Sequence, residues 1–126
     1  MICRCNLPNV GLIVDSFQTL VRKEDPNSIR RIPGDRIFHV QLADAPAIEM
    51  DLLSLSRRFR ALPGEGTLDL IGFVSAVLAT GYRGPFSLEI FRDSFPPGPP
   101  MAIECFCSLY DLINFANRSG TTIVSG

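Results

Sequence analysis

Three side chains that carry oxygen donors stand at or near the ends of hydrophobic segments: Asp15, Gln41 and Glu89. Carboxylate and amide oxygens are hard ligands, and several of them converging on one point suit Mg²⁺, Mn²⁺ or a similar ion. An ion held there polarises a carbonyl group or stabilises an enolate oxygen. These three residues are therefore candidate metal ligands. The alternative is that each merely ends a strand and hydrogen-bonds to neighbouring backbone.

The spacing of these residues matches the length of a repeating unit. Asp15, Gln41, Glu65 and Glu89 are separated by 26, 24 and 24 residues. One strand-helix unit of an eight-fold α/β barrel takes roughly 25 to 35 residues. The C-terminal ends of parallel strands gather on one face, where α/β proteins place their active sites. The spacing therefore favours one polar residue per unit on a common face.

The elements that must position these residues are strands alternating with helices. Almost continuous apolar runs are typical of parallel strands buried on both faces, and three occur, at residues 10–15, 36–42 and 85–91. A helix is expected over residues 16–21, and another from the Asp25-Pro26 pair to about Ile32. This order predicts the α/β class with a parallel sheet.

The clearest helix follows the glycine turn at residues 63–66. Thr67 or Asp69 can cap its start, and Gly81 can end it. Its expected inner face consists of Leu70, Phe73, Val74, Val77 and Leu78. Residues 48–60 precede this turn and are either a helix or an ordered active-site loop.

A final helix is expected after a proline-rich segment. Residues 94–100 hold four prolines and a glycine and predict a loop. The helix is expected over residues 101–117, and residues 119–126 as a frayed tail. Its expected inner stripe consists of Ile103, Phe106, Tyr110 and Ile113.

Composition excludes some classes of function. The 12 basic and 13 acidic side chains leave no basic excess for binding nucleic acid. No apolar run approaches the roughly 18 residues of a membrane span, and no secretory signal is evident, so a cytoplasmic protein is expected. The four cysteines form two Cys-x-Cys pairs, at residues 3 and 5 and at 105 and 107. Structural zinc ligands usually stand further apart, which favours reduced thiols over a zinc site.

Several segments resemble the xylose-isomerase-like sugar phosphate isomerase/epimerase superfamily. They are GLIVDSFQ (residues 11–18), FHVQLAD (38–44), LPGEGTLD (62–69) and GYRGPFSLEI (81–90). These segments resemble, in turn, its fifth strand, its sixth strand, the turn before its seventh helix and its eighth strand. The resemblance implies a partial (β/α)8 TIM barrel of about the last four βα units. It implies a single domain over residues 1–126, with 9–119 as the ordered core.

Within that superfamily, the segments RIPGDRI (31–37) and VQLADAP (40–46) most resemble bacterial 3-dehydroshikimate dehydratases. Many sugar epimerases have histidine where this chain has Gln41. The resemblance implies a divalent ion, Mg²⁺, Mn²⁺ or Co²⁺, bound by Glu, Asp, Gln and Glu. Asp15, Gln41 and Glu89 match the last three, and the first glutamate belongs to a strand that this chain lacks. Ser56 and Arg60 match the pair that holds the substrate, and an Arg fork with a Ser donor suits a carboxylate.

One position departs from the family pattern. Gln18 stands where the family has a catalytic histidine, and glutamine does not exchange protons near neutral pH. The histidine of this chain, His39, lies two residues before Gln41 and so shares its strand face. We expect a structural role for His39.

Three hypotheses about function remain. The first is a metal-dependent dehydratase, a lyase that converts 3-dehydroshikimate to protocatechuate. The second is a sugar phosphate isomerase or epimerase on the same scaffold. The third is a non-catalytic fragment that acts as an assembly module. A half-barrel exposes strand edges and an apolar inner face, so we expect its partner to be a second copy or a separate N-terminal half-barrel.

Overall fold

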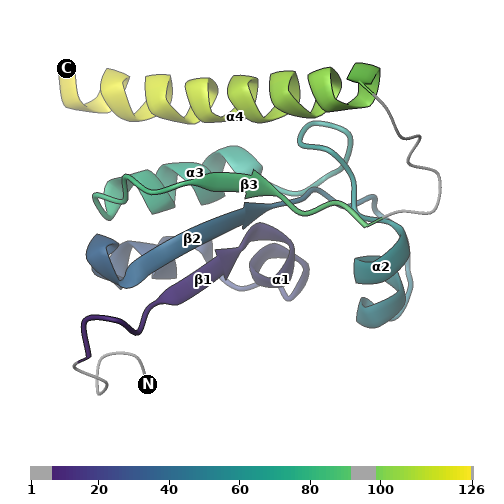
Figure 1. Ribbon diagram of the computed structural model, residues 1–126, viewed down its shortest axis with the longest axis horizontal. Helices are drawn as coiled ribbons and strands as arrows, with labels where there is room; N and C mark the ends of the chain where they lie inside the picture. The colour runs from purple at the N-terminus through teal and green to yellow at the C-terminus, as the bar shows by residue number, and fades with distance from the viewer. Residues whose placement is uncertain (1–6, 92–98, 126) are drawn as a thin grey trace.

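The computed structural model describes residues 7–91 and 99–125 (Figure 1). Strands and helices alternate along the chain, as expected. In chain order the elements are β1 (Leu12–Asp15), α1 (Ser16–Val21), the 3₁₀ helices η2 (Pro26–Arg31) and η3 (Gly34–Arg36), β2 (Ile37–Leu42), α2 (Leu52–Arg58), α3 (Leu70–Ala79), β3 (Phe86–Leu88) and α4 (Pro99–Ser125).

The three strands form one parallel sheet in the order β1-β2-β3. The predicted α/β class and parallel pairing are therefore confirmed. The described residues contain three strands, at the three apolar runs that the sequence predicts, and β2 pairs directly with β3. Between β2 and β3, Ala61 forms an isolated antiparallel bridge with Asp44. Glu65 accordingly lies in a turn, where its carboxylate accepts a hydrogen bond from the Leu62 N–H at 3.2 Å.

Helix α3 covers one face of the sheet and provides most of the core. It lies behind the sheet in Figure 1. Asp69 caps it as predicted, accepting from the Gly72 N–H at 3.0 Å, and Gly81 follows its end with φ of +87°. Its buried residues are Leu70, Phe73, Val74, Ala76 and Val77. They pack against the strand residues that point the same way, Val14, Val40 and Leu42.

Helix α4 packs on α3, but with a different face from the one predicted. Ile103, Phe106 and Tyr110 are 64%, 66% and 58% exposed, and Ile113 is half-buried. The buried residues are Leu112 and Ala116 instead. This helix has apolar residues on more than one face, so its periodicity alone does not identify the inner one. The small Ala116 allows the close approach to α3 that an aromatic residue at this position would prevent.

The limits of α4 also differ from expectation. The helix begins at Pro99, two residues before the predicted start, and proline is well tolerated in a first turn. It continues to Ser125, so the segment expected to fray remains helical. Most of the expected loop, residues 94–98, lies outside the described residues. Within the described part of the chain, no helix is both long and apolar enough to cross a bilayer.

Aspartate caps fix the starts of the shorter helices. Asp15 caps α1, Asp25 caps η2 and Asp51 caps α2, each by accepting a backbone N–H. Helix α1 has the limits that the sequence predicts. Residues 48–60, which could be helix or loop, are partly helical as α2.

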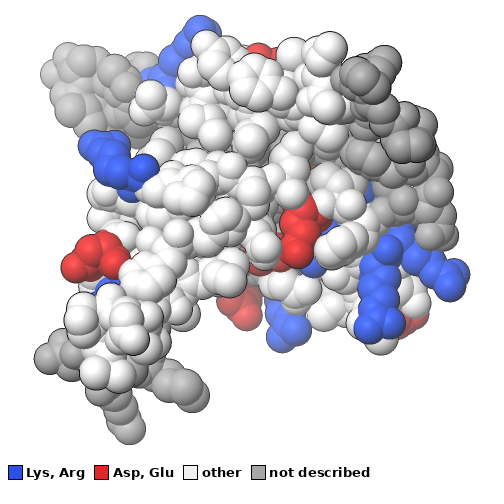
Figure 2. All heavy atoms as spheres, viewed as in Figure 1, with Lys and Arg blue, Asp and Glu red and all other residues white. Residues whose placement is uncertain are grey.

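No helix of residues 7–91 and 99–125 covers the face of the sheet opposite α3. Ile13 is 64% exposed, and its neighbours His39 and Gln41 are half-buried. Figure 2 shows that acidic and basic side chains gather at the right of this side, near the C-terminal ends of the strands, and that further charged side chains lie at the left edge and at the top. In a closed barrel this face would point to the interior.

Candidate metal and carboxylate site

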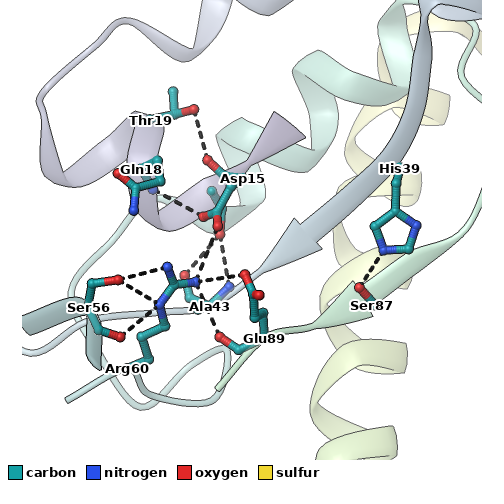
Figure 3. Close-up of polar contacts among 10 residues, drawn as sticks. Asp15, Gln18, Thr19, His39, Ala43, Ser56, Arg60, Ser87 and Glu89 are labelled. Atoms are coloured by element: carbon teal, nitrogen blue, oxygen red, sulfur yellow. Dashed lines mark hydrogen bonds and ion pairs between the residues drawn. The ribbon is translucent and has the colours of Figure 1, made fainter. Parts of the chain in front are cut away.

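Arg60 lies between the two carboxylates that the sequence predicts as metal ligands (Figure 3). Its Nη1 is 3.2 Å from Asp15 Oδ2 and 3.4 Å from Glu89 Oε2. It also donates to the backbone oxygen of Glu89 at 3.3 Å. The Arg60 side chain is only 4% exposed, against 13% for Asp15 and 30% for Glu89. Residues that are 45 and 29 positions apart in sequence therefore meet in one partly buried ionic cluster.

The other end of the guanidinium group is anchored by α2. Arg60 Nη2 donates to Ser56 Oγ at 2.9 Å, and Nε donates to Ser56 O at 3.1 Å. The guanidinium also lies over the ring of Phe17 at 4.5 Å and near that of Phe91 at 5.5 Å. Such cation-π contacts favour a charged guanidinium in a partly desolvated place. The predicted substrate pair, Ser56 and Arg60, is thus assembled as a unit.

Asp15 has two roles at the junction of β1 and α1. Its Oδ1 accepts the Gln18 N–H at 3.1 Å and caps the helix, which leaves Oδ2 directed toward Arg60. The Asp15 backbone oxygen accepts from Thr19 Oγ1 at 2.9 Å. The carboxylate is therefore held in a fixed orientation by its own helix.

The third predicted ligand lies beside Asp15 in the sheet. Gln41 pairs in register with Asp15 on one side and with Ser87 on the other. Glu89 follows Ser87 by two residues, so it shares the same sheet face. Its N–H bonds to Leu42 O at 3.0 Å, which extends the β2-β3 pairing to the site. The register thus brings Asp15, Gln41 and Glu89 to one end of the uncovered face.

This donor set fits part of a hard-ion site. Two carboxylates and one amide provide oxygen ligands of the kind that Mg²⁺ and Mn²⁺ prefer. The described residues contain no group of three or more His, Cys, Asp or Glu side chains that could hold a metal ion. A complete coordination shell therefore requires further ligands, such as water or a carboxylate from elsewhere.

The remaining predicted residues lie around this cluster. Gln18, together with Asp15, lines an open groove of about 460 Å³ between the edge of β1 and η2. His39 Nε2 lies 2.7 Å from Ser87 Oγ, which links β2 to β3 on the uncovered face. This contact agrees with a structural role for His39. Among the cysteines, Cys107 is exposed and Cys105 is half-buried, while residues 3 and 5 lie outside the described part.

Asp44 is a structural centre that the sequence analysis did not identify. It is 2% exposed, and its carboxylate accepts four backbone N–H bonds, each of 2.8 to 3.1 Å, from Ala45, Gly64, Gly66 and Leu68. A Cβ on Gly66 would come within 2.4 Å of Asp44 Oδ1, so the turn needs glycine there. The pairing of a strand-end aspartate with a Gly-x-Gly turn was the available sequence signal.

The backbone of Asp44 connects this turn to the site. Asp44 N donates to Ala61 O at 2.8 Å, and Ala61 N donates to Asp44 O at 2.9 Å. Arg60, the residue before Ala61, donates its own N–H to Phe91 O at 3.1 Å. A second pair of hydrogen bonds joins Ser16 to β2: Ser16 Oγ donates to Ala43 O at 2.9 Å and accepts from Ala43 N at 3.0 Å. These bonds fix the strand ends from which the charged side chains extend.

Comparison with known proteins identifies the family to which this fold belongs. A model of the family described as xylose isomerase-like TIM barrel matches residues 1–109. The chain belongs to this family. The partial barrel predicted from sequence is therefore confirmed, and its uncovered sheet face corresponds to a barrel interior.

The curated relatives of the chain are considerably longer than it is. It is 59% identical over 92 residues to a 3-dehydroshikimate dehydratase of Pseudomonas putida (strain KT2440), covering 73% of this chain and 14% of the relative. It is 51% identical over 102 residues to a protein of the same name from Pseudomonas aeruginosa (strain PAO1), which covers 81% of this chain and 16% of the relative. It is also 30% identical over 90 residues to an inosose isomerase of Bacillus subtilis (strain 168), covering 71% and 32%.

Solved structures share the fold. A xylose isomerase-like TIM barrel/4-hydroxyphenylpyruvate dioxygenase fusion protein matches with a TM-score of 0.82 and 51% identity, over 88% of this chain and 18% of that chain. The IolI protein, whose structure is described with a bound zinc atom, matches with a TM-score of 0.79 and 24% identity. The match covers 89% of this chain and 40% of that chain.

Proposed function

We propose that this chain provides the C-terminal part of a divalent-metal-dependent dehydratase that converts 3-dehydroshikimate to protocatechuate. The observation that carries the proposal is the cluster in which Arg60, anchored by Ser56, meets Asp15 and Glu89 beside Gln41. The names of the two Pseudomonas relatives support the choice of substrate.

Each side chain has a definite task in this proposal. Asp15, Gln41 and Glu89 would hold the ion, which when bound supplies positive charge to an oxygen that becomes negative during the reaction. Arg60 and Ser56 would bind the substrate carboxylate and orient the ring. The reaction removes a proton from the carbon next to the carbonyl and expels a hydroxyl group, so one water leaves per turnover.

The proton acceptor is not Gln18 in this scheme, because an amide does not titrate near neutral pH. A histidine at this position, as in the family, would increase the reaction rate by roughly 10²- to 10⁴-fold. We therefore predict that Gln18→His, which places the imidazole beside Asp15, increases turnover if the complete site is assembled. The check is the rate of protocatechuate formation by ultraviolet absorbance.

The main test combines this chain, in Mn²⁺, with a separately expressed N-terminal half-barrel, taken from the Pseudomonas putida relative as the segment that directly precedes the region matched by this chain. We expect dehydration of 3-dehydroshikimate, and a loss of about 100-fold or more with Glu89→Gln, because the change removes one anionic ligand and its charge. Arg58→Met is a matched control, since Arg58 is exposed at the end of α2. Absence of activity in a correctly folded mixture would reject the proposal.

A second candidate is an isomerase or epimerase of a cyclic polyol or sugar, which the 30% identity to the inosose isomerase favours. The same assembled protein can be offered ketoses and inososes. Turnover of these compounds without dehydration of 3-dehydroshikimate would select this alternative. Tight ion binding with no turnover of either class would instead favour the non-catalytic assembly module.

A further inference from the structure

The two ends of the Arg60 guanidinium group are held with unequal strength. Nη2 makes a 2.9 Å bond to Ser56 Oγ. Nη1 has three oxygen partners at 3.2, 3.4 and 3.3 Å, although it carries only two hydrogens. Charge-assisted N–H···O bonds are usually about 2.7 to 2.9 Å long. The Nη2 end, bonded to α2, is therefore the anchor. The hydrogen bonds of Nη1 are weaker, because three oxygens share its two hydrogens.

The oxygens that Nη1 contacts are the ones that a bound ion needs. Asp15 Oδ1 is used by the Gln18 N–H, so Oδ2 is the oxygen left for an ion, and Arg60 contacts Oδ2. Arg60 also contacts Glu89 Oε2. A divalent ion bound to both oxygens would have a positive charge beside it in a site where Arg60 is 4% exposed. Like charges at short range in a poorly solvated site repel strongly.

We propose that Arg60 is a tethered cation that occupies the carboxylate pair when no ion is present. The divalent ion displaces its Nη1 end from Asp15 and Glu89, and the freed guanidinium binds the carboxylate of the substrate. The two ligands therefore bind with positive coupling, because each stabilises the displaced position of Arg60. This inference rests on the proposed function and adds to it an interdependence between ion and substrate.

The surroundings of Arg60 allow such a movement without loss of the anchor. Ser56 O and Oγ hold Nε and Nη2, while the ring of Phe17 at 4.5 Å restricts the guanidinium plane. Because the guanidinium group is planar and rigid, Nη1 moves away from the two carboxylates by a rotation that pivots on the 2.9 Å Nη2–Ser56 Oγ bond and releases the longer 3.1 Å bond of Nε. A carboxylate ligand then replaces Asp15 and Glu89 as the partner of the positive charge. Because linkage is reciprocal, the ion must strengthen carboxylate binding by the same factor.

The test is calorimetric titration of this chain with Mn²⁺, with and without saturating benzoate, which has a carboxylate but no catechol oxygens to chelate the ion. In the unaltered chain, benzoate should tighten Mn²⁺ binding by a factor of about 5 or more. Arg60→Met should bind Mn²⁺ about tenfold more tightly than the unaltered chain and should show no effect of benzoate. Arg58→Met, which changes an exposed arginine two residues away, should behave as the unaltered chain does.

A second variant tests the proposal if Arg60→Met folds poorly by circular dichroism. Ser56→Ala keeps the guanidinium but removes the anchor at Oγ, so its Mn²⁺ affinity should lie between those of the other two proteins. Equal or weaker Mn²⁺ binding by folded Arg60→Met would overturn the tethered cation, because Arg60 would then organise the ligands rather than compete with the ion. Absence of Mn²⁺ binding in every protein would also overturn the tethered cation, whereas the proposed function is tested separately by the dehydration assay of the two assembled halves.

Discussion

Asp44 shows how one residue can stabilise a site without touching its substrate. A buried carboxylate normally costs several kcal/mol unless it is paired or fully hydrogen-bonded. Here four backbone N–H groups surround it, including those of Gly64 and Gly66. The backbone of Asp44 also pairs with Ala61, next to Arg60. The residue therefore links the glycine turn to the position of the guanidinium group.

We predict that Asp44→Asn lowers the free energy of unfolding by about 3 kcal/mol. Asparagine has one acceptor oxygen, so its NH₂ group would face two backbone N–H donors and leave them unsatisfied. Urea denaturation followed by circular dichroism measures the change. Asp35→Asn, at an exposed position, is the matched control and should alter the free energy by less than about 0.5 kcal/mol. If Asp44→Asn left the free energy of unfolding unchanged, the turn would not depend on this carboxylate.

At the scale of elements, α2 is the short helix that delivers Ser56 to the guanidinium group. It has seven residues and depends on its N-cap, because isolated helices of this length are unstable in water. Asp51 Oδ2 accepts the Ser54 N–H at 2.9 Å. This backbone hydrogen bond, with a further bond to Ser54, lowers the pKa of Asp51 below its usual 3.8. The cap is therefore formed with ionised aspartate at neutral pH.

The pKa of Asp51 predicts the acid behaviour of α2. A carboxyl group whose pKa is lower in the folded state stabilises that state above its unfolded value, and this stabilisation is lost as pH falls through the folded value. We expect the first turn of α2 to fray at acid pH, and to fray at neutral pH in Asp51→Ala. Asp51→Asn should preserve the first turn of α2 at both acid and neutral pH, since asparagine caps helices well and does not titrate. Amide hydrogen exchange at Ser54 and Leu55 measures the fraying, and equal protection in all three proteins would contradict this role.

At the scale of the whole molecule, the described part of the chain covers only one face of the sheet. Helix α3 buries the outer face, while the inner face exposes Ile13 and leaves the edges of β1 and β3 without a neighbour among the described strands (Figure 1). Uncovered apolar faces and strand edges favour association. The partner of this chain is predicted to be a complementary half-barrel or a second copy.

We predict that Ile13→Lys weakens that association, because it places a charge on the face that a partner must bury. Sedimentation velocity of the chain, alone and mixed with the N-terminal half, measures the assembled fraction. Leu53→Lys is a matched control, since Leu53 is 59% exposed on α2, away from the sheet face. If the unaltered chain stays monomeric both alone and in the mixture, the sheet face does not drive association. If Ile13→Lys assembles as well as the unaltered chain, the interface lies elsewhere.

The sequence by itself determined the local features of this protein. Continuous apolar runs identified all three strands, and residues at helix starts identified the cap of η2 as Asp25 and that of α3 as Thr67 or Asp69. Strand ends also located the candidate ligands Asp15, Gln41 and Glu89, because parallel strands necessarily bring these ends together. All of these inferences depend on backbone preferences and periodicities that act over a few residues.

Only the tertiary structure decided which faces meet and which charges pair. Periodicity favoured Ile103, Phe106 and Tyr110 as the inner stripe of α4, but close packing on α3 selected Leu112 and Ala116. The glycine turn was expected, but only the structure showed that the Asp44 carboxylate holds it through the Gly64 and Gly66 N–H groups. The position of Arg60 between two carboxylates results from contacts across 45 and 29 residues, and such contacts follow from the packing of distant elements rather than from local preference.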